Sequence, residues 1–216
     1  MARLLVEAGA VVVSVAYPLA PDHRFPEAVE VGHAALEWTW ARRAKLGGAG
    51  ARVLLAGDEA GGNLAAAVAL VARDRGHPPL AGQVLFAPML APCVGTASLR
   101  ASMECSTACK WADGWQQYLR GPMDAEHPYA VPGKATRLAG LPPALVLSGA
   151  DDPMRDEAMA YARRLGEAGI AVTSAVLTAQ TGWPDSLAEP PTECPCAGAV
   201  REYLRTFFHA AMAPPG

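Results

Sequence analysis

The feature that most constrains the fold of this chain is the alternation of short apolar runs with stretches of helical periodicity. The runs occupy 10–17, 52–56, 83–87, 144–148 and 172–177, and the first of them is an almost continuous series of valines. Apolar residues at helical spacing mark 27–46, 63–75, 155–169 and 197–212. Unbroken apolar strands are typical of parallel sheets buried on both faces, and their alternation with helices favours the same arrangement. We therefore predict an α/β fold of three layers, with helices on both faces of a mostly parallel sheet.

One domain is expected. The chain has 216 residues, of which 51% are hydrophobic, enough for one sizeable core. Residues 92–136 show no clear period and are interpreted as a cap or insertion within a single domain spanning 1–216.

Composition narrows the range of partners. A net charge of −3 gives no electrostatic reason to bind nucleic acid or an anionic membrane. No apolar run approaches the ~20 residues that span a bilayer, and Glu7 interrupts the apolar start, which argues against a signal peptide. The five cysteines are interpreted as reduced thiols of a cytoplasmic protein. Their spacing does not match a metal site, so no metal and no cofactor is expected.

A glycine-containing turn joins one predicted strand to the next helix. It consists of Gly57, Asp58, Glu59, Ala60 and Gly61. A tight strand-to-helix turn needs glycines around its central residue because the backbone there is strained and crowded. The central side chain then lies at the carboxyl end of the sheet, where chemistry collects in open α/β folds, beside the positive end of the helix. The spacing indicates a nucleophile elbow with Glu59 at its centre.

Several segments resemble, in chain order, the hormone-sensitive-lipase type of α/β-hydrolase esterases. They are 12–26, 57–65, 141–146, 152–157 and Gly182-Trp183, and the similarity extends to about Leu187. The resemblance implies an α/β-hydrolase core. It also implies a serine nucleophile within 57–65, a catalytic aspartate within 152–157 and a catalytic histidine just before Gly182.

The chain departs from the family at these positions. Glu59 replaces the serine, and Thr181, or Gly182 if the loop is one residue shorter, replaces the histidine. Asp152 keeps the aspartate position but has no histidine to orient. We therefore predict a degenerate triad at Glu59, Asp152 and Thr181. The expected ligand-binding residues are Gly57, Asp58, Ala60, Gly61 and Trp183.

Other side chains are weaker candidates for the lost base or nucleophile. Ser148 and Ser186 lack the elbow geometry. Lone histidines are usually surface or packed groups. On that ground we discount all five, which are His23, His33, His77, His127 and His209.

The similarity begins after the family's His-Gly-Gly motif, whose strand lies between those equivalent to 11–15 and 52–56. Without such a strand the sheet has a gap with unpaired backbone groups, which costs free energy. The strand at 11–15 could move over, or a second copy could cover the edge. A fragment or a misplaced start would explain the gap equally well. Of these, we expect a homodimer.

Three hypotheses for Glu59 remain open: a residue that drifted into an inactive site, an acid or base, and a covalent nucleophile. The preferred function is a non-hydrolytic protein that binds a small apolar organic molecule and uses Glu59 in acid/base steps such as cyclisation or isomerisation. Alternatives are a binding module resembling the plant gibberellin receptors and a scaffold. A retained carboxylesterase is the least favoured.

Overall fold

A computed structural model describes residues 1–92, 95–103, 109–178 and 195–213. The sheet in this part of the chain is parallel, with strand order β1-β2-β3-β4. The strands are β1 (Leu54–Asp58), β2 (Gly82–Phe86), β3 (Ala144–Gly149) and β4 (Val172–Leu177). The helices are α1 (Ala2–Glu7), α2 (Glu27–Gly47), α3 (Glu59–Arg75), α4 (Ala97–Met103), α5 (Cys109–Tyr118), α6 (Pro122–Ala125), the 3-10 turn η1 (Pro132–Lys134), α7 (Arg155–Glu167) and α8 (Ala197–Met212).

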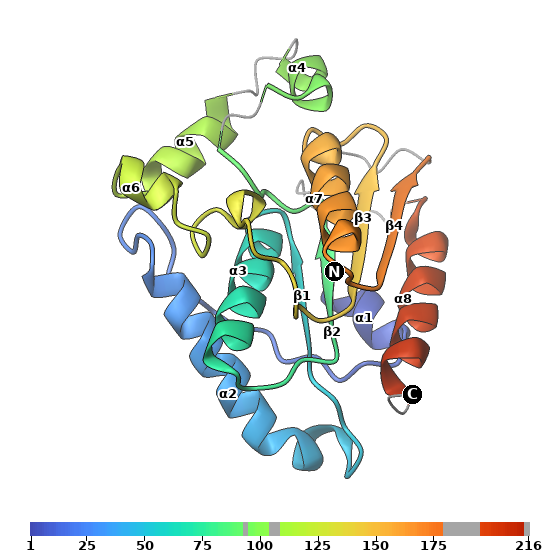
Figure 1. Cartoon of the computed structure of the whole chain (residues 1–216). Helices are drawn as coiled ribbons and strands as arrows, with labels where there is room; N and C mark the ends of the chain where they lie inside the picture. The colour runs from blue at the N-terminus through green and yellow to red at the C-terminus, as the bar shows by residue number, and fades with distance from the viewer. Residues whose placement is uncertain (93–94, 104–108, 179–194, 214–216) are drawn as a thin grey trace.

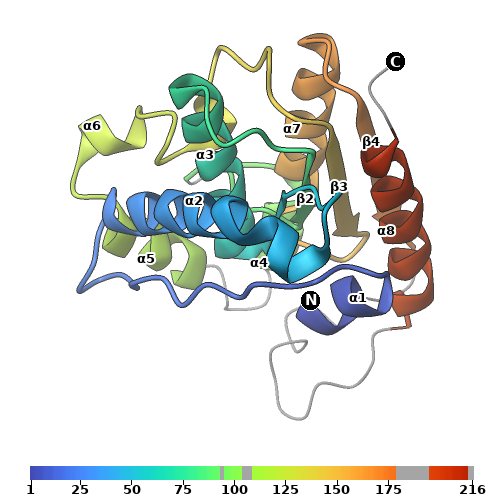
Figure 2. The same ribbon diagram turned by 90° about the horizontal axis from the view of Figure 1, so that it is seen from below.

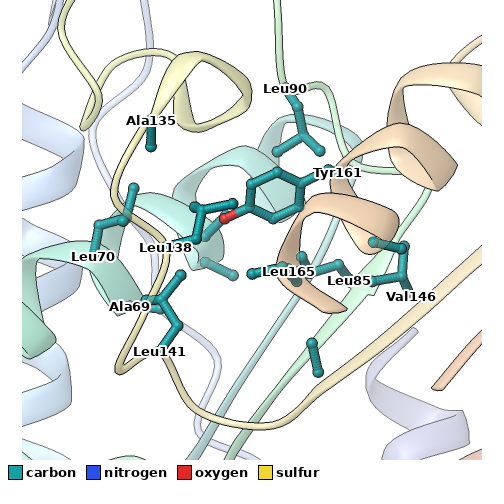
Figure 3. Close-up of a cluster of buried hydrophobic side chains, with 14 of the residues drawn as sticks. Ala69, Leu70, Leu85, Leu90, Ala135, Leu138, Leu141, Val146, Tyr161 and Leu165 are labelled. Atoms are coloured by element: carbon teal, nitrogen blue, oxygen red, sulfur yellow. The ribbon is translucent and has the colours of Figure 1, made fainter. Parts of the chain in front are cut away.

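Helices cover both faces of this sheet, which confirms the predicted three-layer α/β class (Figures 1 and 2). The side chains of β3 show why, because alternate residues of a strand point to opposite faces. Val146 packs with α3 and α7 in the core cluster of Figure 3. Leu145 and Leu147 pack on the other side, with α1 and α8. Outside these layers, α2 packs against α3 through Leu36 and other apolar residues.

The predicted strand at 10–17 is wrong. Residues 10–19 form irregular chain between α1 and α2 (Figure 2), and within the described chain no backbone hydrogen bond joins them to β1. Val12 packs against the apolar cluster that side chains of α8 form with those of β2 and β3. Val11 and Val13, by contrast, are 65% and 39% exposed. An apolar run becomes a strand only where a neighbour accepts its backbone hydrogen bonds. Here β1 pairs with β2 alone among the described strands, so no strand of the described chain lies at its other edge.

The region from 92 to 136 holds α4, α5, α6 and η1, none of which was predicted. In Figure 1, α4 and α5 lie above the sheet, beyond the carboxyl ends of its strands. Trp115 of α5 belongs to the apolar cluster that contains Val29 of α2 and Val71 of α3, so α5 packs against both helices. The description of this region as a cap within a single domain stays a prediction.

Two further findings bear on expectations from composition. Cys196 is disulfide-bonded, so the prediction of reduced thiols is wrong for this residue. The cysteines therefore no longer support the expected cytoplasmic location. None of the helices in the described ranges is both long enough and apolar enough to cross a bilayer.

Candidate functional site

The turn between β1 and α3 has the predicted elbow geometry. Glu59 is the first residue of α3 and has a φ of 45°, in the left-handed region that side chains other than glycine rarely adopt. A Cβ on Gly57 would lie 2.0 Å from the Gly61 backbone oxygen, and one on Gly62 would lie 2.8 Å from Pro88 Cβ. Only glycine fits at these two positions, so the backbone holds Glu59 at the carboxyl end of β1.

The segment that follows β2 supports this turn. Met89 N–H donates a hydrogen bond to the Glu59 carbonyl at 3.1 Å. Asn63 of α3 is 6% exposed, and its Nδ2 donates to the carbonyls of Met89 at 2.9 Å and Ala130 at 3.3 Å. These bonds satisfy the polar groups buried beside the elbow and fix the start of α3 against two neighbouring segments.

A cavity of about 420 Å³ opens beside Glu59. The first turns of α3, the chain at 17–23, Ala28 of α2, Met89 and one face of α5 line it. The lining residues are Tyr17, Pro18, Leu19, Ala20, His23, Ala28, Glu59, Ala60, Asn63, Leu64, Met89, Trp111, Gly114, Trp115, Gln117 and Tyr118. Among the described lining residues, apolar and aromatic side chains predominate and Glu59 supplies a carboxylate, which is the usual composition of a small-molecule site.

Asp152 lies outside this pocket lining. It follows β3, and β2 separates that strand from β1, so the two strands are about 10 Å apart. Its side chain is 5% exposed, and its Oδ1 accepts a hydrogen bond from Met154 N–H at 2.7 Å. Burial raises the pKa of Asp152 to about 6, although the Met154 N–H opposes the rise.

A second carboxylate that sequence reasoning missed is Glu157 of α7. It accepts a hydrogen bond from Leu90 N–H at 3.1 Å, next to the residue that binds the Glu59 carbonyl. Burial raises the pKa of Glu157 to about 7, against the effect of backbone N–H groups at Leu90 and Ala91. Its role is to hold the segment that supports the elbow.

The predicted site residues have different positions. Glu59 and Ala60 line the pocket; Gly57 and Gly61 build the turn; Asp58 is exposed and is not among the lining residues. Thr181 and Trp183 lie outside the described residues. Within the described chain, no three His, Cys, Asp or Glu side chains are grouped so that they could hold a metal ion.

Sequence reasoning discounted His23, yet it lies in the pocket wall. Its Nδ1 is 2.6 Å from Oε2 of Glu27, which is not a lining residue, so one of its two ring nitrogens is already engaged. The signal that would have located the opposite wall is the spacing of Trp111, Trp115 and Tyr118, which repeats at i, i+4 and i+7 on one helical face.

Comparison with known proteins agrees with this geometry. The family model described as the alpha/beta hydrolase fold matches residues 1–181. The esterase LipI of Mycobacterium tuberculosis is 37% identical over 170 residues, covering 77% of this chain and 53% of that protein. The gibberellin receptor GID1 of Oryza sativa subsp. japonica is 38% identical over 169 residues, covering 74% and 47% respectively.

Among solved structures, the carboxylesterase EstE1, cloned from a metagenomic library, superposes with a TM-score of 0.85 at 34% identity. It covers 98% of this chain, which in turn covers 72% of EstE1. The chain spans about half the length of the curated relatives it matches. With the matched region, the four-stranded parallel core and the elbow all in agreement, this chain belongs to the α/β-hydrolase family of the hormone-sensitive-lipase type.

Proposed function

We propose that this chain binds a small, largely apolar organic molecule in the pocket beside the elbow and does not hydrolyse esters by a serine mechanism. The observation that carries the proposal is the position of Glu59. Its backbone is held in the strained elbow conformation, and its side chain lines an apolar cavity of about 420 Å³. In the esterases that the chain resembles, this is the place of the nucleophilic serine.

A carboxylate in this place suits proton transfer. It accepts a proton from a ligand C–H or O–H held against it, and returns the proton to another atom of the same ligand. The backbone N–H groups at the start of α3 favour negative charge there. Aromatic walls keep the ligand oriented, which is the other requirement of an acid/base step.

Covalent catalysis by Glu59 is less well supported. An ester formed on its carboxylate would need an activated water to break it, and hence a base within hydrogen-bond reach. Asp152 follows a strand about 10 Å away, and its carboxylate is engaged by Met154. His23 is the histidine that the described structure places in the pocket lining, and Glu27 pairs with it.

Ester hydrolysis and probe labelling test the proposal. We expect negligible turnover of short-chain p-nitrophenyl esters and no labelling by serine-directed fluorophosphonates, since loss of triad members typically lowers rates by ~10⁴–10⁶. Glu59→Ser alone is expected to leave the chain inactive, because an elbow serine also needs a base. Turnover within tenfold of a typical esterase, abolished by Glu59→Ala, would refute the proposal.

A binding module is the second candidate, favoured by the similarity to a protein named as a gibberellin receptor. Glu59→Gln separates the two candidates, because it keeps the size of the side chain and removes its charge. An enzyme that uses the carboxylate loses turnover of its ligand with this variant, whereas a receptor-like pocket retains its function. Glu126→Gln, in which an exposed carboxylate paired with Lys134 is changed, is the matched control.

A further inference from the structure

The segment at 89–91 connects the pocket to α7. Met89 lines the pocket, and its backbone binds two other lining residues. Its N–H donates to the Glu59 carbonyl at 3.1 Å, and its carbonyl accepts a hydrogen bond from Asn63 Nδ2 at 2.9 Å. The orientation of the Met89 peptide groups therefore sets the relative positions of three residues in the pocket wall.

The next two residues attach this segment to α7. The side chain of Leu90 is 1% exposed and packs with Tyr161 in the cluster of Figure 3. Its N–H donates to Glu157 Oε1 at 3.1 Å, and the backbone N–H of Ala91 also binds the Glu157 carboxylate. Packing holds the Leu90 side chain, whereas these two bonds fix the direction of the peptide groups, which need partners once buried.

The Glu157 carboxylate binds these N–H groups at a cost in stability. Burial raises its pKa from 4.5 to about 7, and the charge of Asp152 adds to the rise. A folded-state pKa above the unfolded value means that this stabilising contribution is lost as pH rises through 7. At pH 8 a neutral side chain would thus be more stable. An ionised carboxylate, however, accepts strongly at both oxygens, whereas protonation turns one oxygen into an O–H donor.

Other charged groups on α7 and on the elements packed against it have their own partners. Asp152, at the end of β3, is the charged side chain of the described chain that acts on the pKa of Glu157. Ion pairs occupy several of the rest: Arg155 with Asp156, Arg163 with Glu167, Arg73 with Asp74, and Lys134 with Glu126. Arg164 donates to the carbonyls of Gly133 and Ala135, and Arg100 of α4 to that of Gly95.

We propose that Glu157 is a positioning residue of the pocket, whose carboxylate orients Met89 against Glu59 through the N–H groups of Leu90 and Ala91. This inference rests on the proposed function, since it assigns a proton-linked regulation to the same pocket. Protonation of Glu157 weakens the attachment of 89–91, so a ligand binds more weakly at low pH. By linkage, a bound ligand favours the ionised form of Glu157 to the same extent.

An uncharged fluorescent probe, N-phenyl-1-naphthylamine, tests this in the whole chain. It is titrated between about pH 5.5 and 8.5 at constant ionic strength. Binding is taken as the fluorescence that Gly114→Phe removes, because Gly114 lines the pocket and a Cβ there would meet nothing within 4 Å. We expect affinity to be about fivefold higher at the upper pH, as for the gain of one hydrogen bond, with a midpoint near 7.

Three variants identify the titrating group. Glu157→Gln should weaken the probe about fivefold at pH 8 and reduce the pH effect to less than twofold, while keeping or raising the free energy of unfolding at pH 8. Asp152→Asn should keep the pH effect but move its midpoint to lower pH, because the charge of Asp152 raises the pKa of Glu157. Glu167→Gln, an exposed glutamate of the same helix paired with Arg163, should change neither affinity nor midpoint.

The outcomes separate this inference from the proposed function. If the probe does not bind in the pocket at any pH, both are wrong. If it binds and Glu157→Gln keeps the pH effect, or lowers affinity and stability together at pH 8, the positioning role is wrong while the apolar pocket stands. Deuterium uptake at 89–91 needs no probe: at pH 8 we expect about fivefold faster exchange in Glu157→Gln than in the unaltered chain, and equal rates would refute the inference.

Discussion

Backbone strain at the elbow gives a prediction in which the usual order of alanine and glycine is reversed. At an ordinary helical position, glycine is about 0.5–1 kcal/mol less stable than alanine. Glu59 has a φ of 45°, and a left-handed residue with a Cβ costs roughly 1–2 kcal/mol. We therefore expect Glu59→Gly to be more stable than Glu59→Ala by about 1 kcal/mol. Both variants lose the carboxylate at the start of α3, so its effect of about 0.3–1 kcal/mol cancels in the comparison.

Glu27 provides the matched control. It is also a glutamate at the first position of a helix, and it is not among the described residues with positive φ. There, Glu27→Ala should be more stable than Glu27→Gly by about 0.5–1 kcal/mol. Chemical denaturation followed by circular dichroism measures all four variants, with equal m-values as the check that unfolding stays comparable. If Glu59→Ala equals or exceeds Glu59→Gly in stability, the elbow stores no strain and the geometric argument for the site fails.

Three other predictions concern stability and assembly. The Tyr161 hydroxyl is buried and without a hydrogen-bond partner in the described structure, so Tyr161→Phe should keep or raise the free energy of unfolding, by up to about 1–2 kcal/mol; a loss above 1 kcal/mol in urea denaturation would contradict this. Asp152 has its folded pKa raised from 3.8 to about 6, so it stabilises the fold fully below pH 4 and loses that contribution as pH rises through 6. Asp152→Asn should thus stabilise the chain at pH 8 by up to about 3 kcal/mol and have little effect at pH 3.5, measured by denaturation at both values; equal effects at the two pH values would mean that the carboxyl is not shifted. Because Val11 is 65% exposed and β1 has β2 as its one neighbour among the described strands, we expect a homodimer in light scattering at micromolar concentration; a folded monomer of 22.5 kDa would refute it.

Features whose causes are local in sequence could be predicted well. The elbow is one, because the crowding that requires Gly57 arises from Gly61, four residues along the chain. The strand at 144–149 is another, since every residue in it is buried. A continuous apolar run correctly predicts a buried strand when the strand has a neighbouring strand on each side, as β3 does.

Features that depend on distant parts of the chain could not be predicted. The run at 10–17 has the composition of a buried strand but no strand to pair with in the described fold, and composition does not report a neighbour. The pocket is formed where the chain at 17–23 meets α5, about ninety residues later, and nothing near Tyr17 in sequence indicates Trp111 or Tyr118 as its neighbours. The pocket could therefore be located only from the structure.

The two sides of the pocket differ in construction. One is helical, from α3 and α5, whereas Tyr17 to Ala20 is irregular chain that leads back to α1, where Glu7 pairs with Arg201 of α8 at 2.8 Å. Amide hydrogens in such a segment exchange readily with solvent, because few of them are protected by backbone hydrogen bonds. A ligand that orders this side would slow exchange at 17–20 and protect it from proteases, with little change in the already protected core of α3. The coil is thus a built-in reporter of occupancy, readable by deuterium uptake without knowledge of the ligand.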